Sequence, residues 1–223
     1  MTRIKICCIQ SVAEAECAAR AGADAIGLVA AMPSGPGPIA DEAIATITDA
    51  MRGRIMTVLL SAETRAEALI EHVARTQPAA VQLVDRVEAD AIPALRAACP
   101  GLTVIQVIHV GGEKALDEAA EAAERADMLL LDSGSPDAEL RTLGGTGRRH
   151  DWRLSRRIVE AAAVPVWLAG GLSPANAASA VREVAPWGLD ICSGLRPHGR
   201  LDPRLLHAFM RAVRENGRQP GGC

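Results

Sequence analysis

The stretch Val164-Pro-Val-Trp-Leu-Ala169 is a short apolar run, and Gly170-Gly-Leu-Ser-Pro174 follows it directly. A run this short, apolar on both faces, is typical of a buried parallel strand. The glycine pair predicts a tight turn. Ser173-Pro174 predicts a helix start, because serine caps helices and proline fits their first turn. Ser11 and Asp202-Pro203 carry the same signal elsewhere in the chain. The stretch therefore predicts a strand–turn–helix unit.

The same unit recurs along the whole chain, because longer Ala-, Glu- and Arg-rich segments with apolar stripes separate the short apolar runs. The runs that predict strands are Arg3–Ile9, Ala25–Ala30, Ile55–Leu60, Ala80–Val84, Leu102–Val110, Met128–Asp132, Val164–Ala169 and Gly188–Cys192. Eight such units in 223 residues predict one α/β domain, a (β/α)8 TIM barrel over residues 1–217, with a loose tail at 218–223. A doubly wound open sheet is the alternative fold.

Composition and charge exclude several classes of partner. The chain carries 24 basic and 27 acidic residues, so its net charge of −3 gives no general attraction to nucleic acid or to an anionic membrane. Its apolar runs fall far short of the roughly 18 residues that a membrane helix needs. Residues 1–6 lead straight into a strand-like run without a signal peptide. We therefore expect a cytoplasmic protein that binds neither nucleic acid nor membrane.

The six cysteines lie at positions 7, 8, 17, 99, 192 and 223, and no two form a C-x-x-C pair or the spacing of a structural zinc site. The size of the chain and the missing signal peptide argue against a disulfide scaffold. Most of these thiols are therefore expected to be small buried hydrophobic groups in a reducing compartment, and no metal site is predicted.

In a barrel the active site lies at the C-terminal ends of the strands. Cys7 lies near the C-terminal end of the first predicted strand and Asp132 ends the sixth. A thiolate and a carboxylic acid that face each other could act as base and acid on one substrate. The structural alternatives are a buried, unreactive thiol and a carboxylate that only braces a loop.

Glycines at the same edge predict a phosphate site. Gly170 and Gly171 lead into a helix N-terminus, and Ser193-Gly194 follows the last strand. Bare backbone N–H groups and the positive end of a helix suit a phosphate, and barrels often place it at these two loops. Gly145 and Gly147, after the sixth strand, could assist. The alternative is that these glycines only serve tight turns.

The order of motifs resembles the phosphoribosylanthranilate isomerase family. The matching stretches are Lys5-Ile-Cys7 (family K-I-C-G), Gly22–Val29 (first repeat), Val81-Gln-Leu83 (V-Q-L-H-G), Leu130–Ser133 with residues 144–147 and Asp151-Trp152 (L-D-S, G-G-T-G, D-W), Leu168–Leu172 with Pro174 and Asn176 (L-A-G-G-L-x-P-x-N), and Gly188-Leu-Asp190 with Ser193-Gly194 (V-D-V-S-S-G). These matches span the chain in order.

The resemblance implies an aldose–ketose isomerase of tryptophan biosynthesis. It implies an Amadori rearrangement, in which Asp132 protonates the ring oxygen of an N-linked aldose phosphate and Cys7 removes the C2 proton to give a 1-amino-1-deoxyketose. It further implies substrate contacts from Lys5, Gln82 and Asp190, a sugar-phosphate substrate, no metal or organic cofactor, and a monomer or homodimer.

Four departures from the family pattern affect the substrate. Pro36 replaces an arginine that the family uses to hold the anthranilate carboxylate. Val84-Asp85 replaces His-Gly, Cys8 replaces the glycine after the base, and Arg196 replaces a glutamate. The proton-transfer pair and the phosphate loops are kept, whereas the aglycone end is changed.

Three interpretations stay open at this point. In the first, the protein is a phosphoribosylanthranilate isomerase in which another cation binds the carboxylate: Arg196, Arg148 or Arg149. In the second, it is a diverged relative that acts on another phosphorylated sugar or aminosugar. In the third, it is a non-catalytic barrel that binds a phosphate ligand, or a metal through soft ligands: Cys7, Cys8, Cys192 and His109.

Overall fold

A computed structural model describes residues 1–33, 35–133 and 150–216, and in these ranges eight strands alternate with eight helices. The strands are β1 (Arg3–Ile6), β2 (Ala25–Val29), β3 (Met56–Ser61), β4 (Ala80–Leu83), β5 (Thr103–His109), β6 (Met128–Asp132), β7 (Val166–Leu168) and β8 (Gly188–Ile191). The helices are α1 (Val12–Ala21), α2 (Asp41–Met51), α3 (Ala66–Thr76), α4 (Ala91–Ala98), α5 (Lys114–Ala123), α6 (Trp152–Ala161), α7 (Ala177–Val184) and α8 (Pro203–Asn216). Two short 3-10 helices, η1 (Ser193–Leu195) and η2 (Pro197–Gly199), lie between β8 and α8.

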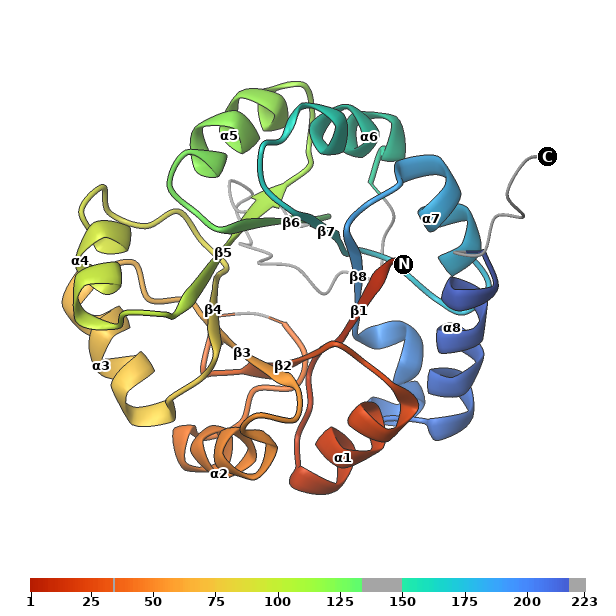
Figure 1. The fold of residues 1–223 in the computed structure, drawn as a ribbon, viewed down its shortest axis with the longest axis horizontal. Helices are drawn as coiled ribbons and strands as arrows, with labels where there is room; N and C mark the ends of the chain where they lie inside the picture. The colour runs from red at the N-terminus through yellow and green to blue at the C-terminus, as the bar shows by residue number, and fades with distance from the viewer. Residues whose placement is uncertain (34, 134–149, 217–223) are drawn as a thin grey trace.

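All strands are parallel and close into one barrel, because β1 pairs with both β2 and β8. Figure 1 shows the helices as a ring around it. The (β/α)8 prediction is therefore confirmed, and the alternative of an open doubly wound sheet is wrong. The predicted tail at 218–223 and the loop that holds Gly145, Gly147, Arg148 and Arg149 lie outside the described residues.

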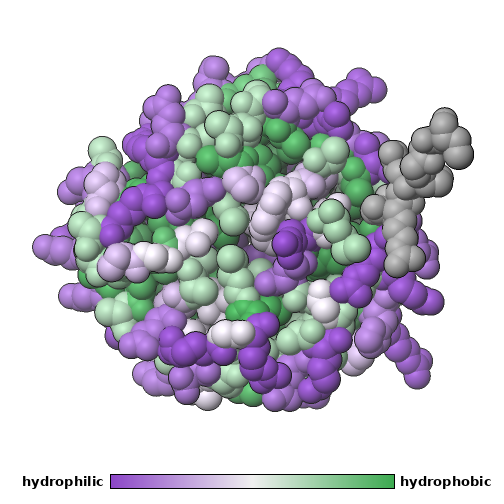
Figure 2. Space-filling view, in the orientation of Figure 1, coloured by the Kyte–Doolittle hydropathy of each residue, from purple (hydrophilic) through white to green (hydrophobic). Residues whose placement is uncertain are grey.

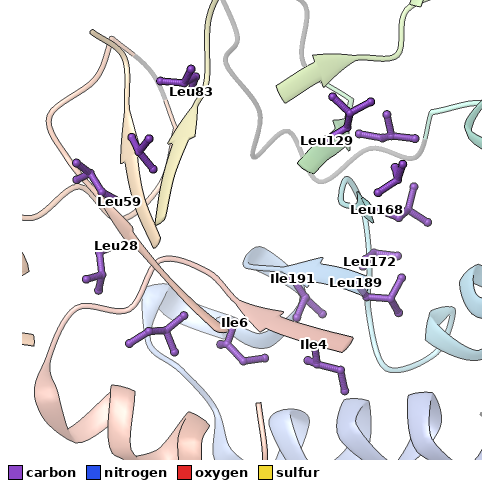
Figure 3. Packing of buried hydrophobic residues seen from close by; sticks show 14 of the residues in the cluster. Ile4, Ile6, Leu28, Leu59, Leu83, Leu129, Leu168, Leu172, Leu189 and Ile191 are labelled. Carbon is purple, nitrogen blue, oxygen red and sulfur yellow. The ribbon is translucent and has the colours of Figure 1, made fainter. Parts of the chain in front are cut away.

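The barrel wall buries side chains on both faces. Those that point outward, such as Ile4, Leu28 and Leu168, pack against the surrounding helices (Figure 3). A second cluster fills the interior, with Val58, Leu130 and other side chains that are almost fully buried. This double burial explains why the strands read as continuous apolar runs rather than as alternating patterns.

The predicted helix starts differ in how well they match the structure. Ser11 caps α1 by accepting a hydrogen bond from the backbone N–H of Glu14, and Asp202 caps α8 in the same way through Arg204. At Ser173-Pro174 the prediction is wrong by one turn. The helix α7 begins after Asn176, whose side-chain oxygen accepts a hydrogen bond from the N–H of Ser173 at 2.8 Å. A capped turn therefore precedes this helix.

The surface of the molecule is polar around its periphery, and apolar residues lie between the polar groups of the face in view (Figure 2). Within the described part of the chain, no helix is both long and apolar enough to cross a membrane.

Candidate active site

A pocket opens where the β1, β6, β7 and β8 strands end, on the side of the barrel that the sequence predicts. Its wall contains Cys7, Cys8, Val29, Met32, Gly35, Pro36, Leu60, Gln82, Val84, Val107, Asp132, Ala169, Gly170, Gly171, Leu172, Asp190, Ile191, Cys192 and Ser193. Cys7 and Asp132 thus contribute to one cavity although 124 residues of chain lie between them. Their roles as base and acid stay predictions; what the structure shows is that both residues line the same pocket.

The strand register places a charged pair beside Cys7. Lys5 stands opposite Asp190 in the β1–β8 ladder, and its ammonium donates a hydrogen bond to Asp190 Oδ2 at 2.9 Å. Both side chains are buried, and the Lys5 ammonium lies close enough to Cys7 to lower the pKa of its thiol. Gly27 of β2 makes room for this arrangement, because a Cβ there would lie 2.6 Å from Cys7 Sγ and 3.1 Å from Lys5 Nζ.

The electrostatics of this cluster set the state of the thiol. Burial raises the pKa of Cys7 to about 11. The Lys5 ammonium and the backbone N–H of Cys8 oppose that rise, whereas the Asp190 carboxylate adds to it. Burial also raises the pKa of Asp190, against the effect of Lys5, and the nearby Asp132 carboxyl raises it further. Cys7 is therefore a thiol at neutral pH, and Lys5 is the group that most favours its thiolate.

Lys5 does not line the pocket and is fully buried, so it is poorly placed for the direct substrate contact that the sequence suggests. Its partners instead indicate that it acts on Cys7. Gln82 and Asp190 do line the pocket. In the described part of the chain, Gln82 Oε1 and Asp190 Oδ1 make no hydrogen bond although they are buried, so both can accept one from a ligand.

Asp132 lies at the end of β6, partly exposed to the cavity. The backbone N–H of Ser133 donates to its Oδ1 at 2.7 Å, which fixes the carboxyl group. Gly170 approaches it closely, since a Cβ on this glycine would lie 3.1 Å from the same oxygen. A glycine here therefore leaves the acid open to the pocket, in addition to allowing the left-handed φ of +81°.

The predicted phosphate loops meet at one side of the pocket. Gly170, Gly171 and Ser193 line it, and Gly194 packs so closely against the carbonyl of Leu172 that a side chain would not fit. A residue to which the sequence analysis gave no role supports the first loop. Asn176 donates from Nδ2 to the carbonyl of Gly171 at 2.8 Å, in addition to accepting from the loop backbone. The family motif L-x-P-x-N contains this asparagine and was the available signal.

Arg196 does not lie where a carboxylate-binding residue is needed. Its guanidinium forms two hydrogen bonds to the Glu14 carboxylate, at 3.2 and 2.8 Å, and it does not line the pocket. Leu201 N–H donates to the same carboxylate. Arg196 therefore ties the loop after β8 to the start of α1, and this geometry argues against it as the replacement cation. Arg148 and Arg149 lie outside the described residues.

The prediction that most of the cysteines are buried thiols is wrong for two of them. Cys8 and Cys192 form a disulfide that joins the loop after β1 to the loop after β8, with their Cα atoms 5.9 Å apart. Cys7, Cys17 and Cys99 are free. Among the described residues, no group of three or more His, Cys, Asp or Glu side chains is arranged to hold a metal ion. His109, a candidate soft ligand, instead hydrogen bonds the carbonyl of Val84 through Nε2 at 3.1 Å.

These features define a class before any comparison is made: a (β/α)8-barrel protein with a pocket at the C-terminal ends of its strands, lined by a thiol, carboxyl groups and two glycine loops. Comparison with known proteins narrows this class. The family described as N-(5'phosphoribosyl)anthranilate (PRA) isomerase matches residues 4–212 of the chain. The chain therefore belongs to the N-(5'-phosphoribosyl)anthranilate isomerase family.

Curated relatives and solved structures agree with this assignment. The N-(5'-phosphoribosyl)anthranilate isomerase of Methanocella arvoryzae is 34% identical over 215 residues, which cover 96% of this chain and 99% of that protein. The isomerase of Haloarcula marismortui is 34% identical over 217 residues, covering 96% and 97%. The crystal structure of the Thermotoga maritima enzyme has a TM-score of 0.80 at 27% identity and covers 96% of this chain and 100% of that one.

Proposed function

We propose that the protein isomerises N-(5'-phosphoribosyl)anthranilate to the corresponding 1-amino-1-deoxyketose phosphate, a step of tryptophan biosynthesis. The observation that carries the proposal is the shared pocket of Cys7 and Asp132 beside the two glycine loops, in a chain that belongs to this family over residues 4–212. One solved relative, 25% identical with a TM-score of 0.78, was crystallised with a reduced form of 1-(o-carboxyphenylamino)-1-deoxyribulose 5-phosphate.

The chemistry needs one acid and one base on opposite sides of the sugar. Asp132 donates a proton to the furanose ring oxygen, the C1–O bond breaks, and the nitrogen lone pair forms a protonated Schiff base at C1. The Cys7 thiolate then removes the C2 proton, and the electron pair neutralises the iminium to give an enolamine. Tautomerisation of the enolamine to the ketone completes the rearrangement, and the two hydrogens that move come from the substrate and the acid.

The Schiff base supplies part of the driving force for the second step. Its positive charge forms next to the base and makes the C2 proton more acidic, and it stabilises a thiolate in the pocket. Lys5 adds a permanent positive charge beneath Cys7. Both effects oppose the burial that otherwise keeps this group protonated.

The substrate phosphate is expected on the backbone N–H groups of the loops after β7 and β8. Gly170 and Gly171 are both in the left-handed region, with φ of +81° and +62°, which only glycine adopts at low cost. This backbone shape turns the loop into the pocket. The contributions of Gly145 and Gly147 stay predictions of the same kind.

A direct assay with N-(5'-phosphoribosyl)anthranilate tests the proposal. Cys7→Ser and Asp132→Asn should each lower kcat by at least about a hundredfold, because each removes one proton-transfer group. Cys99→Ser is the matched control, since this thiol lies at the end of α4 and outside the pocket. A folded wild-type protein that does not turn over this substrate would refute the proposal.

A second candidate substrate follows from the aglycone end of the pocket. Val29, Met32, Pro36 and Val84 line it, and the described part of this wall contains no lysine or arginine side chain. A phosphoribosylamine with an uncharged aglycone suits such a wall better than one with a carboxylate. The assay separates the two, because this candidate requires the aniline derivative to have a higher kcat/KM than the anthranilate derivative.

The remaining expectations belong with this proposal. A cytoplasmic location and independence of nucleic acid fit a small-molecule isomerase, and fractionation of cells would test the first. Whether the protein is a monomer or a homodimer is decided by its sedimentation in solution.

A further inference from the structure

Two positions of the family motifs carry cysteines in this chain. Cys8 stands where the family motif K-I-C-G has glycine, and Cys192 stands where V-D-V-S-S-G has its first serine. The structure joins these two side chains in a disulfide although 184 positions separate them in the sequence. Both residues line the pocket, one next to Cys7 and the other next to the phosphate-loop residue Ser193. The bond therefore connects the two loops that are expected to hold the base and the phosphate.

The backbone at Cys8 is in an unusual conformation that matters for Cys7. Its φ of +61° lies in the left-handed region, where glycine is at ease and a residue with a Cβ is strained. The backbone N–H of Cys8 lowers the pKa of the adjacent Cys7 thiol, so the conformation of Cys8 bears directly on the base. A glycine, as in the family motif, would hold this geometry without strain. Cys8 needs a restraint, and its disulfide supplies one.

The charges that face the Cys7 sulfur make its reactivity depend on where the sulfur lies. Lys5 from β1 favours the thiolate, and Asp190 from β8 disfavours it. Asp132 from β6 acts on Asp190, whose pKa it raises. The closed disulfide ties Cys8, the residue after Cys7, to Cys192 after β8. When the bond opens, this tether between the two loops is lost.

We infer that the Cys8–Cys192 disulfide is a redox-sensitive positioning element for the base, which is aligned when the bond is closed and loses alignment when it opens. The inference rests on the proposed role of Cys7. A closed bond holds the left-handed backbone of Cys8 and, with it, the position of the Cys7 sulfur between Lys5 and Asp190. Cytoplasmic thiol pools tend to keep such pairs reduced, so the activity would follow the redox state of the compartment.

A small-molecule disulfide such as oxidised glutathione supplies the oxidant. Cys192 is the part-exposed partner, whereas Cys8 is only 3% exposed. The Cys192 thiolate therefore attacks one sulfur of the small disulfide, forms a mixed disulfide and releases one thiolate. The Cys8 thiolate then attacks the Cys192 sulfur and releases the second thiolate. Two cysteine thiols are oxidised, the small disulfide is reduced to two thiols, and the two protons end on the released groups.

The test compares oxidised and dithiothreitol-reduced protein, with thiol titration to confirm that reduction frees two more thiols per chain. We expect reduction to lower kcat/KM about tenfold, the effect of one hydrogen bond to a charged group. A readout that does not depend on the isomerase reaction is the alkylation rate of Cys7 at pH 9, resolved by peptide mass spectrometry. It should fall by a similar factor, and it distinguishes failure of this inference from failure of the proposed function.

Three variants make the test specific. Cys192→Ser cannot form the bond, so its Cys7 should react as slowly as in the reduced wild type, with or without reductant. Cys8→Gly accepts the left-handed backbone without strain, so neither of its rates should change on reduction. Cys99→Ser should keep the full response of the wild type. The inference is wrong if reduced wild type or Cys192→Ser alkylates and turns over as fast as the oxidised wild type.

Discussion

Replacing Lys5 with methionine tests the link between the barrel interior and the chemistry. The change removes the ammonium that pairs with Asp190 at 2.9 Å and contacts Cys7, while keeping a side chain of similar length. Two separate effects follow. Asp190 becomes a buried carboxylate without a partner, and such a loss costs about 3–5 kcal/mol of folding free energy. Cys7 also loses the group that most favours its thiolate.

The expected size of the catalytic effect comes from the kind of contact that is lost. A hydrogen bond to a charged group is worth about 1.5–3 kcal/mol, so kcat/KM should fall about ten- to a hundredfold. Urea unfolding followed by circular dichroism measures the stability change. Turnover must be measured without urea and at a temperature where the variant is folded, so that loss of activity does not merely report unfolding.

Asp190→Asn is the informative comparison, because Asp190 and Lys5 act on Cys7 in opposite directions. Removing the carboxylate should speed alkylation of Cys7 at pH 9, whereas Lys5→Met should slow it. Both variants disrupt the same ion pair, so a purely structural role would move the two rates in the same direction. Equal alkylation rates in Lys5→Met and wild type would refute the role assigned to Lys5.

Three further results are expected. Because the Cys7 pKa is about 11, the alkylation rate of Cys7 should keep rising about tenfold per unit from pH 7 to 9, and a plateau below pH 8 would contradict a thiol as the resting state. Burial disfavours the charged form of Glu14, yet the hydrogen bonds from Arg196 lower the pKa of Glu14 below the ordinary 4.5. The stabilisation from this contact is complete above pH 4.5 and is lost as the pH falls. Glu14→Gln should therefore lower the free energy of unfolding in urea by about 1–3 kcal/mol at pH 7 and flatten the acid side of the stability profile. Crystals grown with sulfate should hold the ion on the backbone of Gly170, Gly171 and Ser193, and an ion bound only to arginine side chains elsewhere would contradict the cradle.

The sequence predicts the elements of this fold well where local patterns decide them. The β6 strand begins and ends where the apolar run does, at Met128 and Asp132. The first strand is shorter than predicted, since the apolar residues continue to Ile9 but the ladder ends at Ile6. The reason is the left-handed backbone at Cys8, which turns the chain and which an apolar run does not reveal.

The parts of the site that the sequence does not predict are contacts between distant positions. Arg196 looks available for a substrate until the fold places Glu14, 182 positions earlier, against both of its terminal nitrogens. Cys8 and Cys192 look like two more buried thiols until closure of the barrel brings β1 beside β8. Without such closure, neither partner can be chosen from a single sequence, because many acids and several cysteines are equally plausible.

The buried Lys5–Asp190 pair shows how the fold and the proposed chemistry depend on each other. A buried ion pair is weak evidence for stability, since apolar side chains of similar volume often serve a core equally well or better. Here the pair lies in the barrel interior, Asp190 lines the pocket, and the Lys5 cation acts on Cys7. A purely apolar interior would leave a buried thiol with nothing to oppose its desolvation, and the base would be still harder to ionise. The thiol therefore explains why the two charges are kept in the core. Placing a reactive group there requires them, although they cost folding stability.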